Sequence, residues 1–422
     1  MHVSKLAAWL FLAGAACTTP RSPYLAAADD ADRWLVATAG KHPSKPVPPD
    51  LYYGRAGIVL FHLEAWHATG EDHWAQQACT GADALLASLD QPLEPGLYTG
   101  IAGIGCVLLD AGRILGEPKY HAGAARCVQL LQERAQPVGA GVEWIDTTDI
   151  ISGSAGTGLF LLRAADDLKD ERARDLAARA GRRLLELGRP EAGGLKWAMD
   201  PRFRYLMPNF SHGTAGISYF LATLYGATQQ QEFLDGALAG ARYLLAVADT
   251  RDDGCLVFHH EPDGKDLFYF SWCHGPAGTA ALFHRLGQVT GEARWAPWVE
   301  RGAHSVLHSG VPEQRKPGFW NNLSQCCGDA GVAEWFLDLH RLTGRPEYLA
   351  FAQRATAYLL TRATRTEAGL CWIHAERRVA PEKEEAFVGY MLGAAGFGLL
   401  FVHHYEQERG IERAVRLPDS PW

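Results

Sequence analysis

The sequence has no surplus of positive charge. Its 40 lysines and arginines are outnumbered by 48 aspartates and glutamates, which gives a net charge of −8 at pH 7 and an isoelectric point near 6.1. A protein that holds a phosphate backbone needs a basic face to do so. We therefore expect no nucleic-acid partner.

Long apolar runs are also missing after the N-terminus, where no stretch reaches the ~18 apolar residues of a membrane-spanning helix. The N-terminus itself combines Lys5 with an apolar run of 11 residues, Leu6–Ala16. That length is typical of a secretory signal and too short to span a bilayer. We expect residues 1–25 to be a signal with a short linker, and residues 26–422 to be the folded domain.

The residues at the end of this signal are compatible with export either as a free protein or as a lipoprotein. Cys17 follows Gly-Ala-Ala, which is similar to the site of lipid attachment in bacterial lipoproteins. The protein is then expected in the periplasm, or anchored to the membrane by a lipid at Cys17. Without export it would be cytoplasmic.

Cysteine is sparse, with nine residues in 422. Small exported domains that depend on disulfides have a much higher cysteine density. Two of the nine, Cys326 and Cys327, are adjacent in sequence, and adjacent cysteines rarely bridge to each other. A metal site therefore competes with disulfides as the explanation for these cysteines.

Glycine, by contrast, is abundant: 45 of 422 residues, about 11% against a typical value of about 7%. Part of this surplus belongs to the phrase Gly-x-Ala-Gly, which recurs seven times at intervals of 46 to 65 residues. The copies begin at Gly54, Gly100, Gly153, Gly213, Gly275, Gly328 and Gly393. A recurring unit of this length indicates one repeat architecture in place of several unrelated domains.

Each repeat predicts a helical hairpin. A nearly continuous apolar run follows the glycine phrase, as in 58–66, and is typical of a helix buried all round. An amphipathic segment such as 171–187 comes next, with apolar residues three and four apart, and predicts a helix exposed on one face. The apolar helices are thus inner and the amphipathic ones outer.

The two ends of the chain complete this pattern. Segment 26–39 is of the outer type but has no inner helix before it, whereas the seventh repeat has an inner helix and no outer one. Pairing them closes a ring. We therefore predict an all-α fold, an α/α toroid of seven inner and seven outer helices with little strand, and we expect a monomer.

Chemically active side chains gather just before four consecutive phrases. Asp149, His212, Cys273 and the pair Cys326-Cys327 precede the third to sixth phrases by one to four residues. If every inner helix begins at its phrase, these residues share one rim of the barrel. Three thiols on one rim are typical of a zinc site that keeps a fourth position open, although buried cysteines can also simply pack.

The histidines near the rim have candidate roles in chemistry, whereas the cysteines outside the rim do not. At the rim, His212 suits a general acid or base, with Asp149 as a second proton carrier or as its orienting partner. His274 is an alternative ligand, a hydrogen-bonding neighbour or a wall of the site. The cysteines outside the phrase register are expected to pack, and His403 and His404 are interpreted as helix-end residues without a role.

These motifs resemble those of the lanthionine synthetase C-like family, along the chain from about Tyr52 to His403. The likeness is carried by the seven glycine phrases and four motifs: Asp149-Ile-Ile-Ser-Gly153, Ser211-His212-Gly213, Trp272-Cys273-His274-Gly275 and Cys326-Cys327-Gly328. The resemblance implies one zinc ion per chain, held by Cys273, Cys326 and Cys327. It also implies addition of a cysteine thiolate to a dehydroamino acid, with His212 protonating the enolate carbon and Asp149 assisting.

The second ligand motif departs from the usual pattern, because the stand-alone cyclases of this family usually have Cys-His where this chain has Cys326-Cys327. The substrate is expected to be a dehydrated peptide or a thiol such as glutathione. Alternatives are a zinc protein that joins glutathione to other electrophiles and a non-catalytic thiol-binding scaffold. A glycosidase of the same fold is a further alternative, but it would need two facing carboxylates.

Overall fold

The computed structural model describes residues 21–39, 46–200, 207–250, 254–255, 268–314, 322–375 and 384–422. Within these ranges the chain forms fourteen α-helices and four two-stranded hairpins. The predicted lipid-anchor residue Cys17 and the rest of the apolar signal lie outside the described residues. None of the described helices is both long and apolar enough to cross a membrane.

Seven helices form an inner ring, and each begins directly after the first glycine of a phrase. Most of their residues are buried, as the apolar runs predict. The inner helices are α2 (Arg55–Thr69), α4 (Ile101–Leu115), α6 (Ser154–Leu168), α8 (Thr214–Thr228), α10 (Pro276–Thr290), α12 (Asp329–Thr343) and α14 (Ala394–Arg409).

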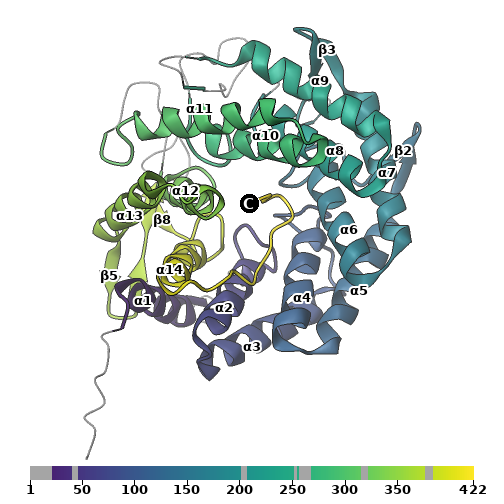
Figure 1. The fold of residues 1–422 in the computed structure, drawn as a ribbon. Coiled ribbons are helices and arrows are strands. Elements are labelled where there is room, and N and C mark those ends of the chain that lie inside the picture. Colours follow the sequence, from purple (N-terminus) through teal and green to yellow (C-terminus); the bar gives the residue numbers. More distant parts are fainter. Residues whose placement is uncertain are drawn as a thin grey trace, which may run out of the picture.

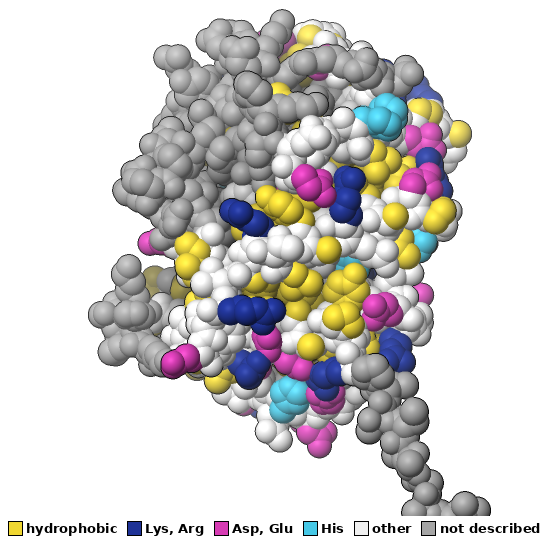
Figure 2. Space-filling view, turned by 90° about the vertical axis from the view of Figure 1, so that its left-hand side faces the viewer, with side chains coloured by type: hydrophobic (Ala, Val, Ile, Leu, Met, Phe, Trp, Pro, Cys, Tyr) yellow, Lys and Arg dark blue, Asp and Glu magenta, His cyan; other side chains and the backbone are white. Residues whose placement is uncertain are grey.

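The outer ring consists of amphipathic helices that each bury one face against an inner helix (Figure 1). They are α3 (Asp72–Ser88), α5 (Pro118–Arg134), α7 (Glu171–Leu187), α9 (Gln231–Val247), α11 (Ala296–Leu307), α13 (Pro346–Thr361) and α1 (Pro23–Ala39), with the short 3₁₀ turn η2 (Ala293–Trp295) before α11. Charged side chains of both signs lie among apolar ones on the side shown in Figure 2.

The ring closes between the two ends of the chain. Helix α1 packs against α14, and α14 packs against α2, so the last inner helix borders the first. This seam between α14 and α2 confirms the predicted α/α toroid. The outer-type segment predicted over 26–39 begins three residues earlier, at Pro23.

Strand content is low, as predicted, and is confined to antiparallel hairpins outside the helices. Three of the hairpins follow outer helices α5, α7 and α13. The pairs are β1 (Gln136–Val138) with β2 (Gly141–Glu143), β3 (Arg189–Glu191) with β4 (Gly194–Lys196), β5 (Thr364–Thr366) with β6 (Gly369–Cys371), and β7 (Ile373–Ala375) with β8 (Glu384–Ala386).

The second glycine of each phrase explains why the phrase recurs. At Gly278, a Cβ atom would lie 2.0 Å from the carbonyl oxygen of Trp272, six residues earlier. Five other phrases repeat this contact with the residue six positions before, at 1.9 to 2.1 Å. A side chain cannot be tolerated there, so glycine lets each loop fold back onto the first turn of its inner helix. The repeat therefore fixes the position of every loop on the rim.

Backbone hydrogen bonds join the seven loops into a closed ring. In each repeat, the backbone of the residue two positions before the phrase is hydrogen-bonded to the equivalent residue of the next repeat. The third repeat differs slightly, because Ile151 accepts one of its two hydrogen bonds and Ile150 donates the other. The N–H to carbonyl pairs are Tyr52 to Tyr98, Tyr98 to Ile151, Ile150 to Ser211, Ser211 to Cys273, Cys273 to Cys326, Cys326 to Met391 and Met391 to Tyr52, at 2.8 to 3.3 Å. The loops thus form one rigid rim.

The C-terminal segment 410–422 runs from the end of α14 into the centre of the toroid (Figure 1). The backbone N–H groups of Ala414 and Val415 donate to Glu64 at 2.7 and 2.6 Å. Further in, the Tyr98 hydroxyl donates to Asp419 at 2.8 Å. The segment therefore fills the bore beneath the rim.

Candidate metal centre

Three thiols meet on the rim. The Sγ atom of Cys273 lies 3.1 Å from that of Cys327, which lies 3.2 Å from that of Cys326. All three side chains are buried, and their sulfur atoms lie within 4.8 Å of one another. None of the eight cysteines in the described ranges forms a disulfide. The structure thus brings together the three cysteines that the sequence grouped by register.

Two of the three cysteines occupy equivalent positions in adjacent repeats. Cys273 and Cys326 each stand two residues before a phrase, and the Cys273 N–H donates to the Cys326 carbonyl at 3.0 Å. Cys327 follows Cys326 directly. The backbone ring therefore sets the spacing of the thiols.

Binding of a cation by these buried sulfur atoms would be coupled to the loss of their protons. Burial raises the pKa of Cys326 well above its usual range, and hydrogen bonds to Cys273 and Cys326 raise that of Cys327 together with burial. The Tyr52 hydroxyl donates to the Cys326 sulfur at 3.1 Å. A buried thiol becomes a thiolate when a positive charge compensates it, so metal binding here would release protons.

The donor set fits zinc. Thiolate ligands select soft or borderline metals such as zinc and disfavour magnesium or manganese. Three protein ligands around a tetrahedral zinc ion leave one position for water or substrate. This cluster could hold such an ion.

A buried carboxylate orients His212 on the same rim. Asp149 is fully buried, and its Oδ2 atom lies 2.5 Å from the Nδ1 atom of His212. Its Oδ1 atom accepts the N–H groups of Ser152 and Gly153 at 2.8 and 2.9 Å. The carboxylate is therefore fixed by its own loop and fixes the imidazole in turn.

This contact also decides the charge of His212. Burial alone would lower the pKa of His212, but the hydrogen bond and the charge of Asp149 outweigh it and raise the pKa above its ordinary value. The His212 side chain is 28% exposed. Because Nδ1 faces Asp149, Nε2 on the other side of the ring is the nitrogen that can exchange a proton.

His274 lies between other rings of the rim. It is buried, with its ring centroid 5.8 Å from that of His212 and 4.9 Å from that of Tyr269. It is not part of the thiol cluster found in the described ranges. Of the three roles open from the sequence, this placement favours a wall of the site.

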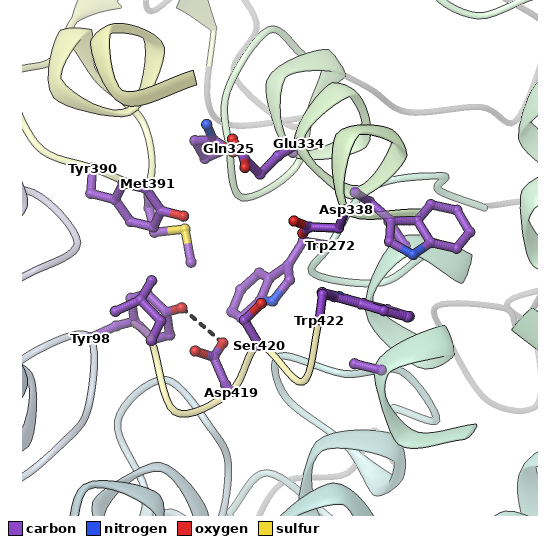
Figure 3. Close-up of a pocket in the computed structure, with 15 residues that line it drawn as sticks. Tyr98, Trp272, Gln325, Glu334, Asp338, Tyr390, Met391, Asp419, Ser420 and Trp422 are labelled. Atoms are coloured by element: carbon purple, nitrogen blue, oxygen red, sulfur yellow. Dashed lines mark hydrogen bonds between the residues drawn. The ribbon is translucent and has the colours of Figure 1, made fainter. Parts of the chain in front are cut away.

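A cavity of about 70 Å³ lies between the rim and the C-terminal segment (Figure 3). Tyr98 and Trp272 line it from the rim, and Asp419 lines it from the C-terminal segment. Burial raises the pKa of Asp419 to about 6. The volume has room for a few ordered waters. Glu334 and Asp338 of α12 also line this cavity, so it connects the rim with charged groups deeper in the bore.

A second cluster of side chains that could hold a metal ion was not predicted from the sequence. Glu64, His403 and Glu406 are buried, and their ligand atoms lie within 4.8 Å of one another. The interpretation of His403 and His404 as helix-end residues was wrong, because both are buried within α14. The available signal was an acidic residue inside an apolar inner helix, such as Glu64 within α2.

Solved structures share this fold. Nisin cyclase superposes with a TM-score of 0.68 at 16% identity, over 91% of this chain and 94% of that one. Cellobiose 2-epimerase from Bacillus thermoamylovorans superposes with a TM-score of 0.50 at 15% identity, over 76% and 87% of the two chains. An unsaturated glucuronyl hydrolase from a Bacillus species also has a TM-score of 0.50, at 12% identity over 93% and 99%. At these identities the likeness concerns the fold alone.

The sequence itself carries a narrower assignment. Residues 45–412 match the family model described as lanthionine synthetase C-like protein. The match extends from before the first glycine phrase to the end of the last inner helix, and it includes every rim residue described above. The chain therefore belongs to the lanthionine synthetase C-like family.

Proposed function

We propose that this protein is a zinc enzyme that adds a cysteine thiolate to dehydroalanine or dehydrobutyrine and so forms a thioether. The observation that carries the proposal is the placement of three buried thiols and the Asp149–His212 pair on one hydrogen-bonded rim. Family membership and the fold shared with nisin cyclase support it. The proposed substrate is a dehydrated peptide that also contains a cysteine.

Cys273, Cys326 and Cys327 would hold the zinc ion. Zinc bound there would lower the pKa of an incoming thiol, so that a nucleophilic thiolate exists near neutral pH. The Cys-Cys pair at the second motif gives three thiolate ligands in this chain. With zinc bound, their combined negative charge would make the thiolate of a substrate more electron-rich and so more nucleophilic.

The Asp149–His212 pair would handle the proton. In the addition, sulfur bonds to Cβ of the dehydro residue, the C=C π electrons move to Cα, and Cα takes up a proton. Protonated His212 would donate that proton from Nε2, while Asp149 holds the Nδ1 side of the ring. The thiol of the next substrate loses one proton when it ionises, and the neutral imidazole takes up one proton. Each cycle therefore releases and consumes the same number of protons.

The test is a peptide that contains one cysteine and one dehydroalanine. Cyclisation leaves the mass unchanged and removes the free thiol, so the product resists alkylation. We expect the protein to accelerate this loss, with the Cys326→Ser variant at the rate of buffer alone. No acceleration by folded protein with a full zinc content would contradict the proposal. If glutathione binds to such protein without any addition, the rim is a thiol-binding scaffold.

We also propose export through the N-terminal segment, on the basis of Lys5, the apolar run and Cys17. The N-terminus of the mature protein, purified from fractions of its native host, tests this. A start at Cys17 with an attached lipid would identify a lipoprotein, and a start a few residues later a cleaved signal. An intact Met1 in the cytosol would contradict export.

A further inference from the structure

We propose that Glu64, His403 and Glu406 form a second divalent-cation site, located at the seam of the toroid and separate from the thiol rim. Glu64 lies in the C-terminal half of α2, and His403 and Glu406 lie in the C-terminal half of α14. The thiols, in contrast, precede the N-terminal ends of the inner helices. The two sites therefore lie toward opposite ends of the barrel.

The geometry suits one metal ion. One ligand atom from each of the three residues lies within 4.8 Å of the other two. Glu64, His403 and Glu406 are only 0%, 6% and 1% exposed. Two carboxylates and one imidazole are ligands that manganese, ferrous iron and zinc accept. The site therefore differs in preference from the three thiols.

The polar atoms of this cluster are poorly paired within the protein. The Nε2 atom of His403 has no hydrogen-bond partner in the described part of the chain. The Glu406 carboxyl meets the Glu64 carboxyl, and no N–H or hydroxyl donor of the described residues reaches it. Buried polar atoms in folded proteins are nearly always paired with protein or an ordered ligand. A cation between these atoms would satisfy all of them together.

A neighbouring acid orients His403 as metal-binding histidines are usually oriented. Glu334 Oε1 lies 2.7 Å from His403 Nδ1. The Nδ1–H group therefore donates to the carboxylate, and the lone pair remains on Nε2, the nitrogen without a partner. A carboxylate behind a histidine ligand in this way fixes its tautomer and increases its basicity.

The local charge also favours a cation. Arg413 forms ion pairs with Glu334 and Asp338, at 2.7 Å each. Within the described ranges, no basic side chain lies within ion-pair distance of Glu64 or Glu406. Glu64 and Glu406 are thus two buried carboxyl groups without a basic partner of their own, and a divalent cation would allow both to be ionised.

A cation here would connect three parts of the molecule. Glu64 belongs to the first inner helix, and His403 and Glu406 belong to the last. Glu64 also accepts the backbone N–H groups of Ala414 and Val415 from the C-terminal segment. Binding would therefore stabilise the closure of the ring and the position of residues 410–422 in the bore.

Manganese is the probe, because a soft thiolate site disfavours it. We expect Mn²⁺ to bind at about one ion per chain by electron paramagnetic resonance titration and to raise the melting temperature of the full chain. Cys326→Ser should leave this binding unchanged, which separates the site from the rim and from the proposed function. The exposed residue Glu408, on the same helix, provides the matched control Glu408→Gln.

Two variants test the ligands. Glutamine matches glutamate in size and keeps a carbonyl oxygen, so Glu406→Gln should fold. It should lose Mn²⁺ binding and the melting-temperature shift, whereas Glu334→Gln should weaken binding about 10- to 100-fold. The proposal is overturned if neither Mn²⁺ nor Zn²⁺ binds beyond the rim, or if Glu406→Gln binds as the unaltered protein does.

Discussion

The two ends of the barrel use the same inner helices in different ways. At the rim, loops of equivalent register meet through a ring of backbone hydrogen bonds and present thiols, a histidine and an aspartate. At the other end, Glu64 and Asp110 from the helices themselves hold the C-terminal segment 410–422. Three thiols at the rim contrast with carboxylates and an imidazole at the seam.

This contrast assigns different tasks to the two ends. Side chains on loops outside the helices can be replaced without disturbing the packing of the toroid, which suits a site that does chemistry. Buried acids on the inner helices belong to the packing itself. We therefore expect substitutions at the rim to change metal content and rate, and substitutions in the bore to change stability.

The largest effect is expected from Cys326→Ser. It removes one of three ligands from the rim, so zinc bound there should be lost and thiol addition should fall to the uncatalysed rate. Elemental analysis and the thiolate-to-cobalt absorption of cobalt-loaded protein measure the metal. Cys79→Ser, which alters a cysteine outside the cluster, is the control and should keep both. Full rim metal in Cys326→Ser would refute this ligand assignment.

His212→Asn should cause the next largest loss. General acid catalysis typically contributes a factor of about 10² to 10⁴, and the turnover of thioether formation should fall by that amount. Zinc content should stay unchanged, because His212 is hydrogen-bonded to Asp149 and is not part of the thiol cluster. Loss of zinc in this variant would instead make His212 a ligand.

Asp149→Asn should change the pH dependence of the rate. Asp149 raises the pKa of His212, so without its charge the imidazole loses its proton at lower pH. The alkaline limb of the pH–rate profile should therefore move to lower pH. If the two residues act as a unit, the double variant with His212→Asn should be little worse than His212→Asn alone. An unmoved limb would mean that another group donates the proton.

The smallest effect on chemistry is expected in the bore, from Asp419→Asn. Burial raises the pKa of Asp419 from its ordinary 3.8 to about 6, so the folded state holds this proton more tightly than the unfolded state does. The native aspartate therefore costs no stability below about pH 4 and up to about 3 kcal/mol above pH 6. The variant should gain stability over the native protein as pH rises from 4 to 7, with unchanged turnover. Urea unfolding at both pH values measures this gain, and a pH-independent difference would contradict it.

The rim could be predicted from the sequence because its residues obey the repeat. Cys273 and Cys326 stand at the same distance from their glycine phrases, so a prediction of the inner helices also placed the thiols on one rim. Asp149 was harder to place, since it lies four residues from its phrase. Whether these residues catalyse a reaction and bind zinc remains a prediction.

The opposite end could not be predicted in this way. Glu64 and Glu406 lie within apolar helices whose rotation about their axes a repeat phrase does not fix. The segment 410–422 has no counterpart in the other repeats, and its place in the bore depends on hydrogen bonds to scattered side chains such as Glu64 and Tyr98. Contacts between residues far apart in sequence and outside the repeat leave no local pattern.

The three-thiol zinc site is best tested by X-ray absorption at the zinc edge of the protein loaded with one equivalent of zinc. We expect about three sulfur neighbours at about 2.3 Å and one oxygen or nitrogen neighbour at about 2.0 Å. These sulfur neighbours should be absent from the spectrum of Cys326→Ser. A first shell of oxygen and nitrogen alone, or a disulfide between any two of Cys273, Cys326 and Cys327, would contradict it.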